Sequence, residues 1–258
     1  MRKFKIDRQI LPSLEVLPNV YVLITNRTNA VSTWYDVAKE NIISAQILLQ
    51  NERYSHSVFF IQQSIECCIK GVFLENSIAE PQDVKDINHY AFRAFRTYHR
   101  KVQDEACLEY SNIVSSYIDK GCTFSQKLEI CAAIANILTT DYNNLIDVEG
   151  KTLSAYYDPK ALGLDESTSQ IDCHKRFSKI YYFQFLLILF SYLFSHTVEM
   201  DARYPVFGEN NSIITPMTSF DGKLKKNLLL LIIILQHIIS EIIESSLNLV
   251  FWHKDDKT

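Results

Sequence analysis

A short basic segment carries the side chains best suited to chemistry. Residues 89–101 contain four lysine or arginine residues and no acid. If the segment is helical, four basic side chains fall on one face at steps of four, three and four: His89, Arg93, Arg96 and Arg100. A guanidinium group donates to two phosphate oxygens at once, and the intervening aromatics could stack on unpaired bases. This pattern predicts a phosphate- or RNA-binding face, although a solvated basic face over an aromatic core stripe has the same spacing.

Other patterns of reactive residues argue against metal and nucleotide-loop chemistry. No HExxH motif occurs, and none of the six cysteines forms a CxxC pair, so we expect no metal site and reduced, buried cysteines. Glycine is scarce, and neither GxGxxG nor GxxxxGK[ST] is present. The phosphate loops of Rossmann and P-loop proteins are therefore excluded, and we expect no cofactor.

The composition limits where the protein works and what it can bind. The chain has 258 residues, of which 47% are hydrophobic, and its net charge is -4. Without a global basic field, any contact with nucleic acid must be local. The first residues lack the apolar core of a secretory signal, so we expect a cytoplasmic protein. Residues 1–31 are expected to form an N-terminal arm, and residues 32–253 a single domain.

Two predicted helices must position the basic segment. The first runs from Thr33 to Gln50, with Thr33 as its N-cap and Asp36 completing a capping box. The second follows a link of three residues and runs from Tyr54 to Asn76, so the two should pack antiparallel.

The second helix has an apolar stripe and a polar side. Apolar residues recur at alternating steps of three and four, at Val58, Ile61, Ile65, Cys68 and Val72. Polar residues lie between them, at Gln62, Gln63, Glu66 and Lys70. We expect an ordinary core helix whose polar side faces solvent.

The rest of the chain is also predicted to be largely helical. Helices are expected over 102–117 and 124–145, followed by a long surface loop over 146–172, partly ordered by Tyr156 and Tyr157. Two very apolar segments, 175–198 and 224–252, follow. Polar residues interrupt both before a bilayer could be crossed, so we expect no membrane span. They are expected to be buried helices, either as core or as a dimer interface.

The first helix pair resembles the opening of a HEPN domain (higher eukaryotes and prokaryotes nucleotide-binding). The matching residues are Trp34, Ala38, Ala45, Tyr54, Phe59, Gln62, Gln63, Glu66 and Lys70. Weaker similarity continues at residues 87–89, the start of the family's next helix, and at the Arg-Tyr-Pro of residues 203–205. The resemblance implies an all-α fold, an antiparallel helical bundle of HEPN type, here with an enlarged middle region at about 100–175.

The resemblance also implies a catalytic pair. HEPN proteins that cleave RNA use an arginine, four to six further residues, and then a histidine, paired across a dimer. Arg93 and His99 have five residues between them, although they follow the second helix rather than lying near the last ones. An imidazole near neutral pKa can move a ribose hydroxyl proton, while an arginine holds the phosphate and stabilises its charge.

Two functional classes follow from these features. The first is a nucleotide- or RNA-binding protein of a toxin–antitoxin or phage-defence system, and specifically a metal-independent endoribonuclease. Its expected partners are a second copy in a homodimer, RNA or a nucleotide, and a cognate antitoxin or nucleotidyltransferase. The alternative is a non-catalytic helical module that dimerises or binds a partner.

Overall fold

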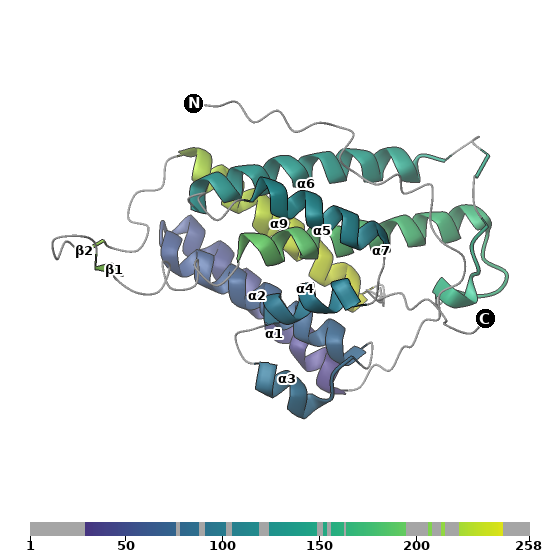
Figure 1. Ribbon diagram of the computed structural model, residues 1–258, viewed down its shortest axis with the longest axis horizontal. Coiled ribbons are helices and arrows are strands. Elements are labelled where there is room, and N and C mark those ends of the chain that lie inside the picture. Colours follow the sequence, from purple (N-terminus) through teal and green to yellow (C-terminus); the bar gives the residue numbers. More distant parts are fainter. Residues whose placement is uncertain are drawn as a thin grey trace.

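Most of the residues that the structure describes lie in helices (Figure 1), which confirms the predicted all-α class. The computed structural model describes residues 29–75, 78–87, 91–101, 105–118, 124–148, 152–153, 156–162, 164–194, 206–207, 213–214 and 222–244. The exception to the helical architecture is a short antiparallel hairpin in which β1 (Val206–Phe207) pairs with β2 (Ile213–Ile214). The predicted N-terminal arm, apart from the start of the first helix, lies outside the described residues.

The first two helices form the predicted antiparallel pair. Helix α1 (Asn29–Gln50) and helix α2 (Tyr54–Glu75) are joined by a tight turn in which Glu52 has a positive φ of 59°. Two α2 serines donate to backbone carbonyls of α1: Ser57 Oγ to Ala45 at 2.8 Å, and Ser64 Oγ to Ala38 at 2.7 Å. These bonds satisfy buried hydroxyls and fix the register of the two helices.

The start of α1 differs from the prediction. The helix begins at Asn29, so Thr33 lies inside it and cannot be its N-cap. Val31, which precedes the predicted start, is fully buried. Burial of this extra apolar turn is a sufficient reason for the helix to extend past the capping signal.

The predicted apolar stripe of α2 is confirmed, but its solvated side is not. All five stripe residues are buried, yet Gln62, Glu66 and Lys70 are buried as well. Helix α2 packs against α1, α3 (Pro81–Ile87), α4 (Ala91–Lys101), α7 (Gln170–Leu193) and α9 (Gly222–Glu244). Because α2 has neighbours on so many sides, every residue from Ile61 to Glu75 except the half-buried Gln63 is buried.

Helix α7 is the centre of the second half of the chain. Every residue from Ile180 to Ser191 is buried, and α7 packs against α2, α4, α5 (Glu105–Tyr117) and α6 (Phe124–Ile146). This agrees with the prediction of a buried helix, although α7 begins earlier than residue 175 and ends at Leu193. Residues beyond 194, which the prediction included in this helix, lie outside the described residues.

Tyr157 links the loop between α6 and α7 to α7. Tyr157 exchanges two hydrogen bonds with Gln170, and its hydroxyl lies 2.8 Å from His174 Nδ1. Tyr156, the other residue expected to order this loop, is 82% exposed. A 3-10 turn at Lys160–Leu162 follows and places Leu162 in the core.

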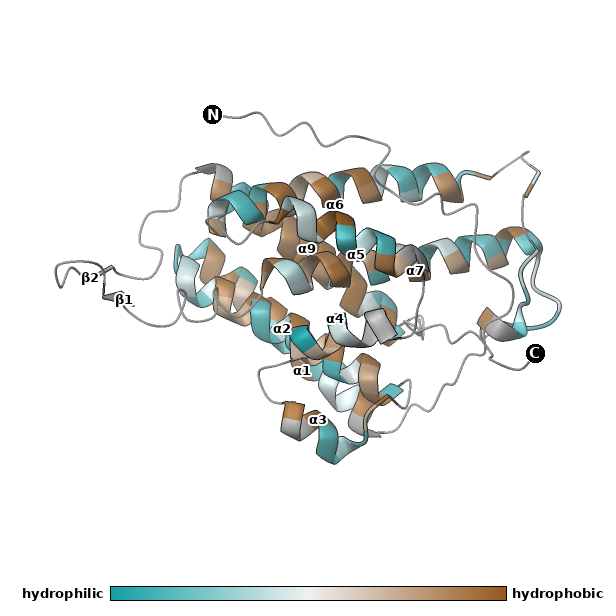
Figure 2. Cartoon of the chain, viewed as in Figure 1, coloured by the Kyte–Doolittle hydropathy of each residue, from teal (hydrophilic) through white to brown (hydrophobic). Residues whose placement is uncertain are grey.

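Two described helices are long and apolar enough to cross a membrane by length and composition alone. One is α2, of whose most apolar window 83% is buried, so it is a core helix. The other is the α9 segment Leu224–Glu244, of which only 39% is buried. In Figure 2, α9 is coloured mostly as hydrophobic. The prediction of buried, reduced cysteines is confirmed for Cys67, Cys68, Cys107, Cys131 and Cys173.

Candidate nucleic-acid interface

The basic segment forms a helix, as predicted. Helix α4 covers residues 91–101 and packs against α2, α5 and α7 through Ala91, Phe92 and Phe95. The ring of Phe95 stacks on that of Phe73 in α2, with centroids 6.2 Å apart. Burial of this apolar side directs the opposite side of α4 outward.

Arg93 lies on that outward side and is exposed, together with Thr97. His99 and Arg100 are within α4, but their side chains lie outside the described residues, and so does His89. The structure therefore places the backbone of Arg93 and His99 on one helix, about 1.7 turns apart.

Arg96 points toward α7. Its Nη1 donates a hydrogen bond to the backbone carbonyl of Ser191, and its guanidinium lies over the ring of Tyr192 at 4.9 Å. Ser191 is in the last turn of α7, where carbonyls lack partners within the helix and the helix dipole favours a cation. Arg96 is thus in contact with α7, whereas Arg93 faces solvent.

Tyr192 extends this contact to a third helix. Its hydroxyl is 2.7 Å from Ser111 Oγ in α5. Arg96, Tyr192 and Ser111 therefore join α4, α7 and α5 near the C-terminal end of α7. Sequence periodicity could not find this cluster, because it depends on residues 81 and 95 positions apart. The sequence signal for the Arg96 contact was an arginine in an amphipathic helix. A phosphate-binding arginine gives the same pattern.

A second polar cluster is formed by residues that carried the family resemblance. Lys70 Nζ and Glu66 Oε1 are 2.7 Å apart and both side chains are buried. The Lys70 ammonium also lies 5.0 Å from the centre of the Trp34 ring, and Gln63 Nε2 is 3.5 Å from Glu66 Oε2. Since this lysine's charge is compensated inside the helix pair, Lys70 is a structural residue of the α1–α2 interface.

The thiol of Cys67 lies next to this cluster, and its surroundings keep it unreactive. Burial, and then the neighbouring Glu66 carboxylate, raise the pKa of the Cys67 thiol to about 11. A thiol that keeps its proton at neutral pH is a poor nucleophile. Among the residues that the structure describes, no three His, Cys, Asp or Glu side chains come together as metal ligands.

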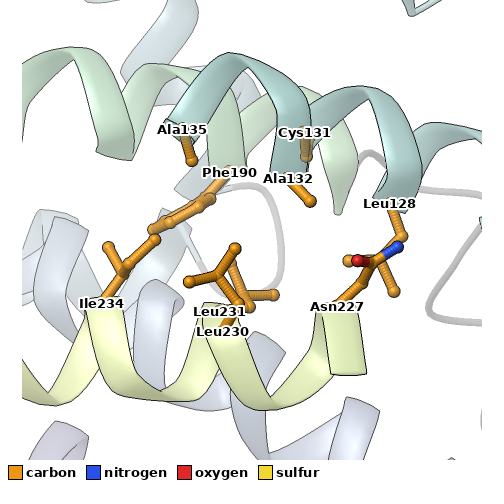
Figure 3. Close-up of a pocket in the computed structure, with 9 residues that line it drawn as sticks. All are labelled: Leu128, Cys131, Ala132, Ala135, Phe190, Asn227, Leu230, Leu231 and Ile234. Atoms are coloured by element: carbon orange, nitrogen blue, oxygen red, sulfur yellow. The ribbon is translucent and has the colours of Figure 1, made fainter. Parts of the chain in front are cut away.

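The groove between α6 and α9 is too apolar to be a catalytic site (Figure 3). Its lining residues come from α6, α7 and α9, and include Leu128, Ala132, Phe190, Leu230 and Ile234. Asn227 supplies the amide drawn at one end. The lining contains no acid, base or exposed nucleophile, because Cys131 is buried and burial raises its pKa well above the ordinary value. This groove can accept an apolar side chain.

Comparison with known proteins identifies part of the chain. Residues 31–121 match the family model of the HEPN domain. This stretch runs from the first turns of α1 past the end of α5, and so includes α4 and the Arg93–His99 spacing. No curated protein and no solved structure matches the chain.

Proposed function

We propose that the protein acts on RNA or nucleotides through the outward side of α4, which lies within the stretch, residues 31–121, that matches the HEPN domain model. The observation that supports this proposal is the exposure of Arg93 on a helix whose other side is held against α2 and α7. An exposed guanidinium on a fixed helix can approach a phosphate without rearrangement of the core.

The proposed chemistry is metal-independent cleavage of RNA by Arg93 and His99. The His99 imidazole would take the proton of a ribose 2′-hydroxyl, whose oxygen attacks the adjacent phosphorus. The bond from phosphorus to the 5′ oxygen breaks, and that oxygen receives the proton back from the imidazolium. Arg93 would stabilise the negative charge on the phosphate during attack. The products are a 2′,3′-cyclic phosphate and a 5′-hydroxyl.

Arg96 has a different role in this proposal from the one expected from its spacing. Since it contacts Ser191 and Tyr192, it would hold α4 in place and position Arg93. His89 and Arg100 remain candidate phosphate contacts by their spacing alone. A metal-independent nuclease of this kind suits a toxin–antitoxin or phage-defence system, in which a cognate antitoxin or nucleotidyltransferase would restrain it.

The test is cleavage of a labelled RNA by the purified full chain in the presence of EDTA. Four variants are compared with the wild type: His99→Ala, Arg93→Ala, and two controls matched in residue type. His56→Ala removes an exposed histidine at the start of α2, and Arg53→Ala an exposed arginine before it. Loss of a general base or of a phosphate contact in catalysis lowers the rate by about 100-fold or more.

We expect cleavage to be lost in the two α4 variants and retained in the two controls, with 2′,3′-cyclic phosphate ends on the products. Equal cleavage by His99→Ala and the wild type would refute the catalytic assignment. No cleavage by any of the proteins would leave RNA binding to be measured. Binding that depends on salt and on Arg93 would then support a non-catalytic HEPN module.

The second candidate function is this non-catalytic module, which dimerises or binds a partner protein. It is favoured by the apolar side chains that α1 and α9 expose, among them Ile47 and Ile233. These lie on helices other than α4, so partner binding and RNA contact can be tested separately.

A further inference from the structure

Helix α9 has more apolar surface than the rest of the described fold covers. Like α2, it is long and apolar enough to cross a membrane, yet only 39% of its apolar window is buried, against 83% for α2. Leu229 and Ile233 are exposed on α9, and Ile43 and Ile47 on α1. Ile47 and Ile233 are each more than half exposed, at 53% and 52%. Single exposed apolar residues are common, but a contiguous group often marks an interaction site.

These four residues lie on one continuous surface. Gln236 Nε2 donates to Gln46 Oε1 at 2.6 Å, and Lys225 Nζ is 3.6 Å from Glu52 Oε1. Helices α1 and α9 therefore lie side by side and antiparallel, with the end of α1 beside the start of α9. Steps of four residues keep each exposed apolar pair on one side of its helix. This shared outer surface is the α1–α9 face.

One end of the α1–α9 face is basic. Lys226 and Arg53 are exposed there, and Lys225 pairs with Glu52 while its ammonium lies 6.0 Å from the centre of the Tyr54 ring. The first turn of α9 contains no acid. Cations in the first turn of a helix oppose its dipole, so these lysines do not stabilise α9 itself. The basic end is complementary to an anionic partner.

The centre of the face is aliphatic. Between Lys226 and His237, the exposed residues of α9 are Leu229 and Ile233, and the neighbouring part of α1 exposes isoleucines and Gln50. The centres of protein–protein interfaces are instead enriched in tyrosine, tryptophan and arginine. An aliphatic surface beside a group of cations is typical of a helix that lies on a membrane surface.

We propose that the α1–α9 face binds the surface of a bilayer that contains anionic lipids. Ile47, Leu229 and Ile233 enter the boundary between headgroups and acyl chains, while Lys226 and Arg53 contact lipid phosphates. Helix α9 lies along the membrane rather than across it, because its other side is packed against α1 and α6.

The acids of the face set its orientation on the membrane. Asp36, Glu40 and Glu244 are exposed at the end opposite the basic one. Like charge repels these acids from an anionic surface. The basic end therefore approaches the bilayer first, and the acidic end is tilted away from it.

The groove between α6 and α9 borders the same face. Leu230 and Ile234 line it and directly follow the exposed Leu229 and Ile233 in sequence (Figure 3). The groove therefore extends the apolar surface toward α6 and offers a place for part of an acyl chain. Helix α4 packs with α2, α5 and α7, so the inference does not depend on the proposed nuclease activity.

The first test is co-sedimentation of the full chain with large vesicles. Vesicles of phosphatidylcholine alone are compared with vesicles of equal parts phosphatidylcholine and phosphatidylserine. The wild type should bind the anionic vesicles about tenfold more tightly or better, because each cation near an anionic surface adds to the attraction. Added salt should weaken this binding.

Variants of the face separate its apolar and basic parts. The double variant Ile47→Gln, Ile233→Gln should lower the partition coefficient on anionic vesicles by about tenfold or more. Lys226→Glu should lower it by about tenfold. The matched controls are Ile171→Gln and Lys175→Glu, at exposed positions of α7, and both should bind like the wild type.

The second test looks for a gain of binding, which a damaged fold cannot produce. Glu40 is exposed and lies three residues before Ile43. Glu40→Gln removes a negative charge beside the apolar centre, so binding to anionic vesicles should tighten by about threefold to fivefold.

The third test detects insertion of the face below the headgroups. Ile233→Trp places an indole at the centre of the face, and vesicles with lipids brominated on their acyl chains should quench its emission. The signal of the wild type, with Trp34 and Trp252, is subtracted. Ile171→Trp is the control, and its added indole should not be quenched.

Several outcomes would overturn the proposal. A wild-type chain that does not bind anionic vesicles would do so, and so would equal binding by the wild type and the double glutamine variant. Vesicle binding lost in Arg93→Ala but kept in the double variant would assign the contact to α4. Protein association in sedimentation velocity, abolished by the glutamine substitutions and without vesicle binding, would assign the face to a protein partner. Circular dichroism of each variant verifies that the helices are retained.

Discussion

The hydroxyl of Tyr35 in α1 donates a 2.6 Å hydrogen bond to Oε2 of Glu75, the last residue of α2, and both side chains are buried. The ring of Tyr35 lies against Gly71, where a Cβ atom would come within 2.5 Å of the ring. The absence of a side chain at Gly71 is what allows the tyrosine to cross α2 and reach the carboxylate. This contact ties the first turns of α1 to the end of α2.

Removal of the Tyr35 hydroxyl should destabilise the fold. In Tyr35→Phe, the buried carboxylate of Glu75 loses a donor, which costs about 1–3 kcal/mol of the free energy of unfolding. Urea denaturation followed by circular dichroism measures this change. Tyr156→Phe, which removes the hydroxyl of an exposed tyrosine, serves as the control and should have no effect. Equal stability of the two variants would show that the Tyr35 bond contributes nothing net.

Arg93 and Arg96 should differ sharply in their effect on stability, although they are three residues apart on one helix. Arg96→Ala removes the donor to the Ser191 carbonyl and the cation over the Tyr192 ring. We expect a loss of about 1.5–3 kcal/mol, typical of a hydrogen bond from a charged group. Arg93→Ala, at an exposed position, should change stability by less than about 0.5 kcal/mol. Comparable losses in both variants, measured by chemical denaturation, would contradict the assigned orientation of Arg96.

The loop before α7 should open more readily without the Tyr157 hydroxyl. His174 Nε2 is 2.9 Å from the carbonyl of Leu145, which can only accept, so Nε2 donates to it, and His174 Nδ1 lies 2.8 Å from the Tyr157 hydroxyl. Burial raises the pKa of Tyr157, so the phenol keeps its proton. In Tyr157→Phe, amide exchange in residues 156–162 should accelerate about threefold to tenfold. Tyr156→Phe should leave exchange unchanged; identical exchange in both variants would exclude this role.

The stability of the protein should decrease as the pH rises from 9.0 to about 11, partly because of Cys67. In the unfolded chain this thiol loses its proton near its ordinary pKa of 9.0, whereas in the folded chain burial keeps it protonated up to about 11. Within this range the unfolded state binds fewer protons, so its population increases as the pH rises. Through Cys67 the free energy of unfolding falls by at most about 2–3 kcal/mol over this range, and below pH 9 none of this stability is lost.

Urea denaturation of the wild type and of Cys67→Ala at several pH values measures this contribution. As the pH rises from 9.0 to about 11, the wild type should lose more of its free energy of unfolding than Cys67→Ala does. A difference that stays constant with pH would show that Cys67 does not titrate between the two states.

Much of the helical framework could be predicted from the sequence because it depends on local periodicity. The three- and four-residue steps of Val58, Ile61 and Ile65 identified α2 and its buried stripe, and the short link before Tyr54 predicted an antiparallel pair. The ends of α1 were less accurate, since the capping signal at Thr33 competes with the burial of Val31. A local signal cannot measure how much apolar surface a further turn will bury.

The directions of the polar side chains were decided by the tertiary structure. Spacing alone placed Arg93 and Arg96 on one basic face, and Glu66 and Lys70 on a solvated one. In the folded chain, Arg96 contacts the end of α7, and Glu66 and Lys70 form a buried pair beside Trp34. The periodicity of a helix states which residues share a side, but not which other helix covers that side. That depends on packing between segments far apart in the chain, which here brings residue 96 to residue 191.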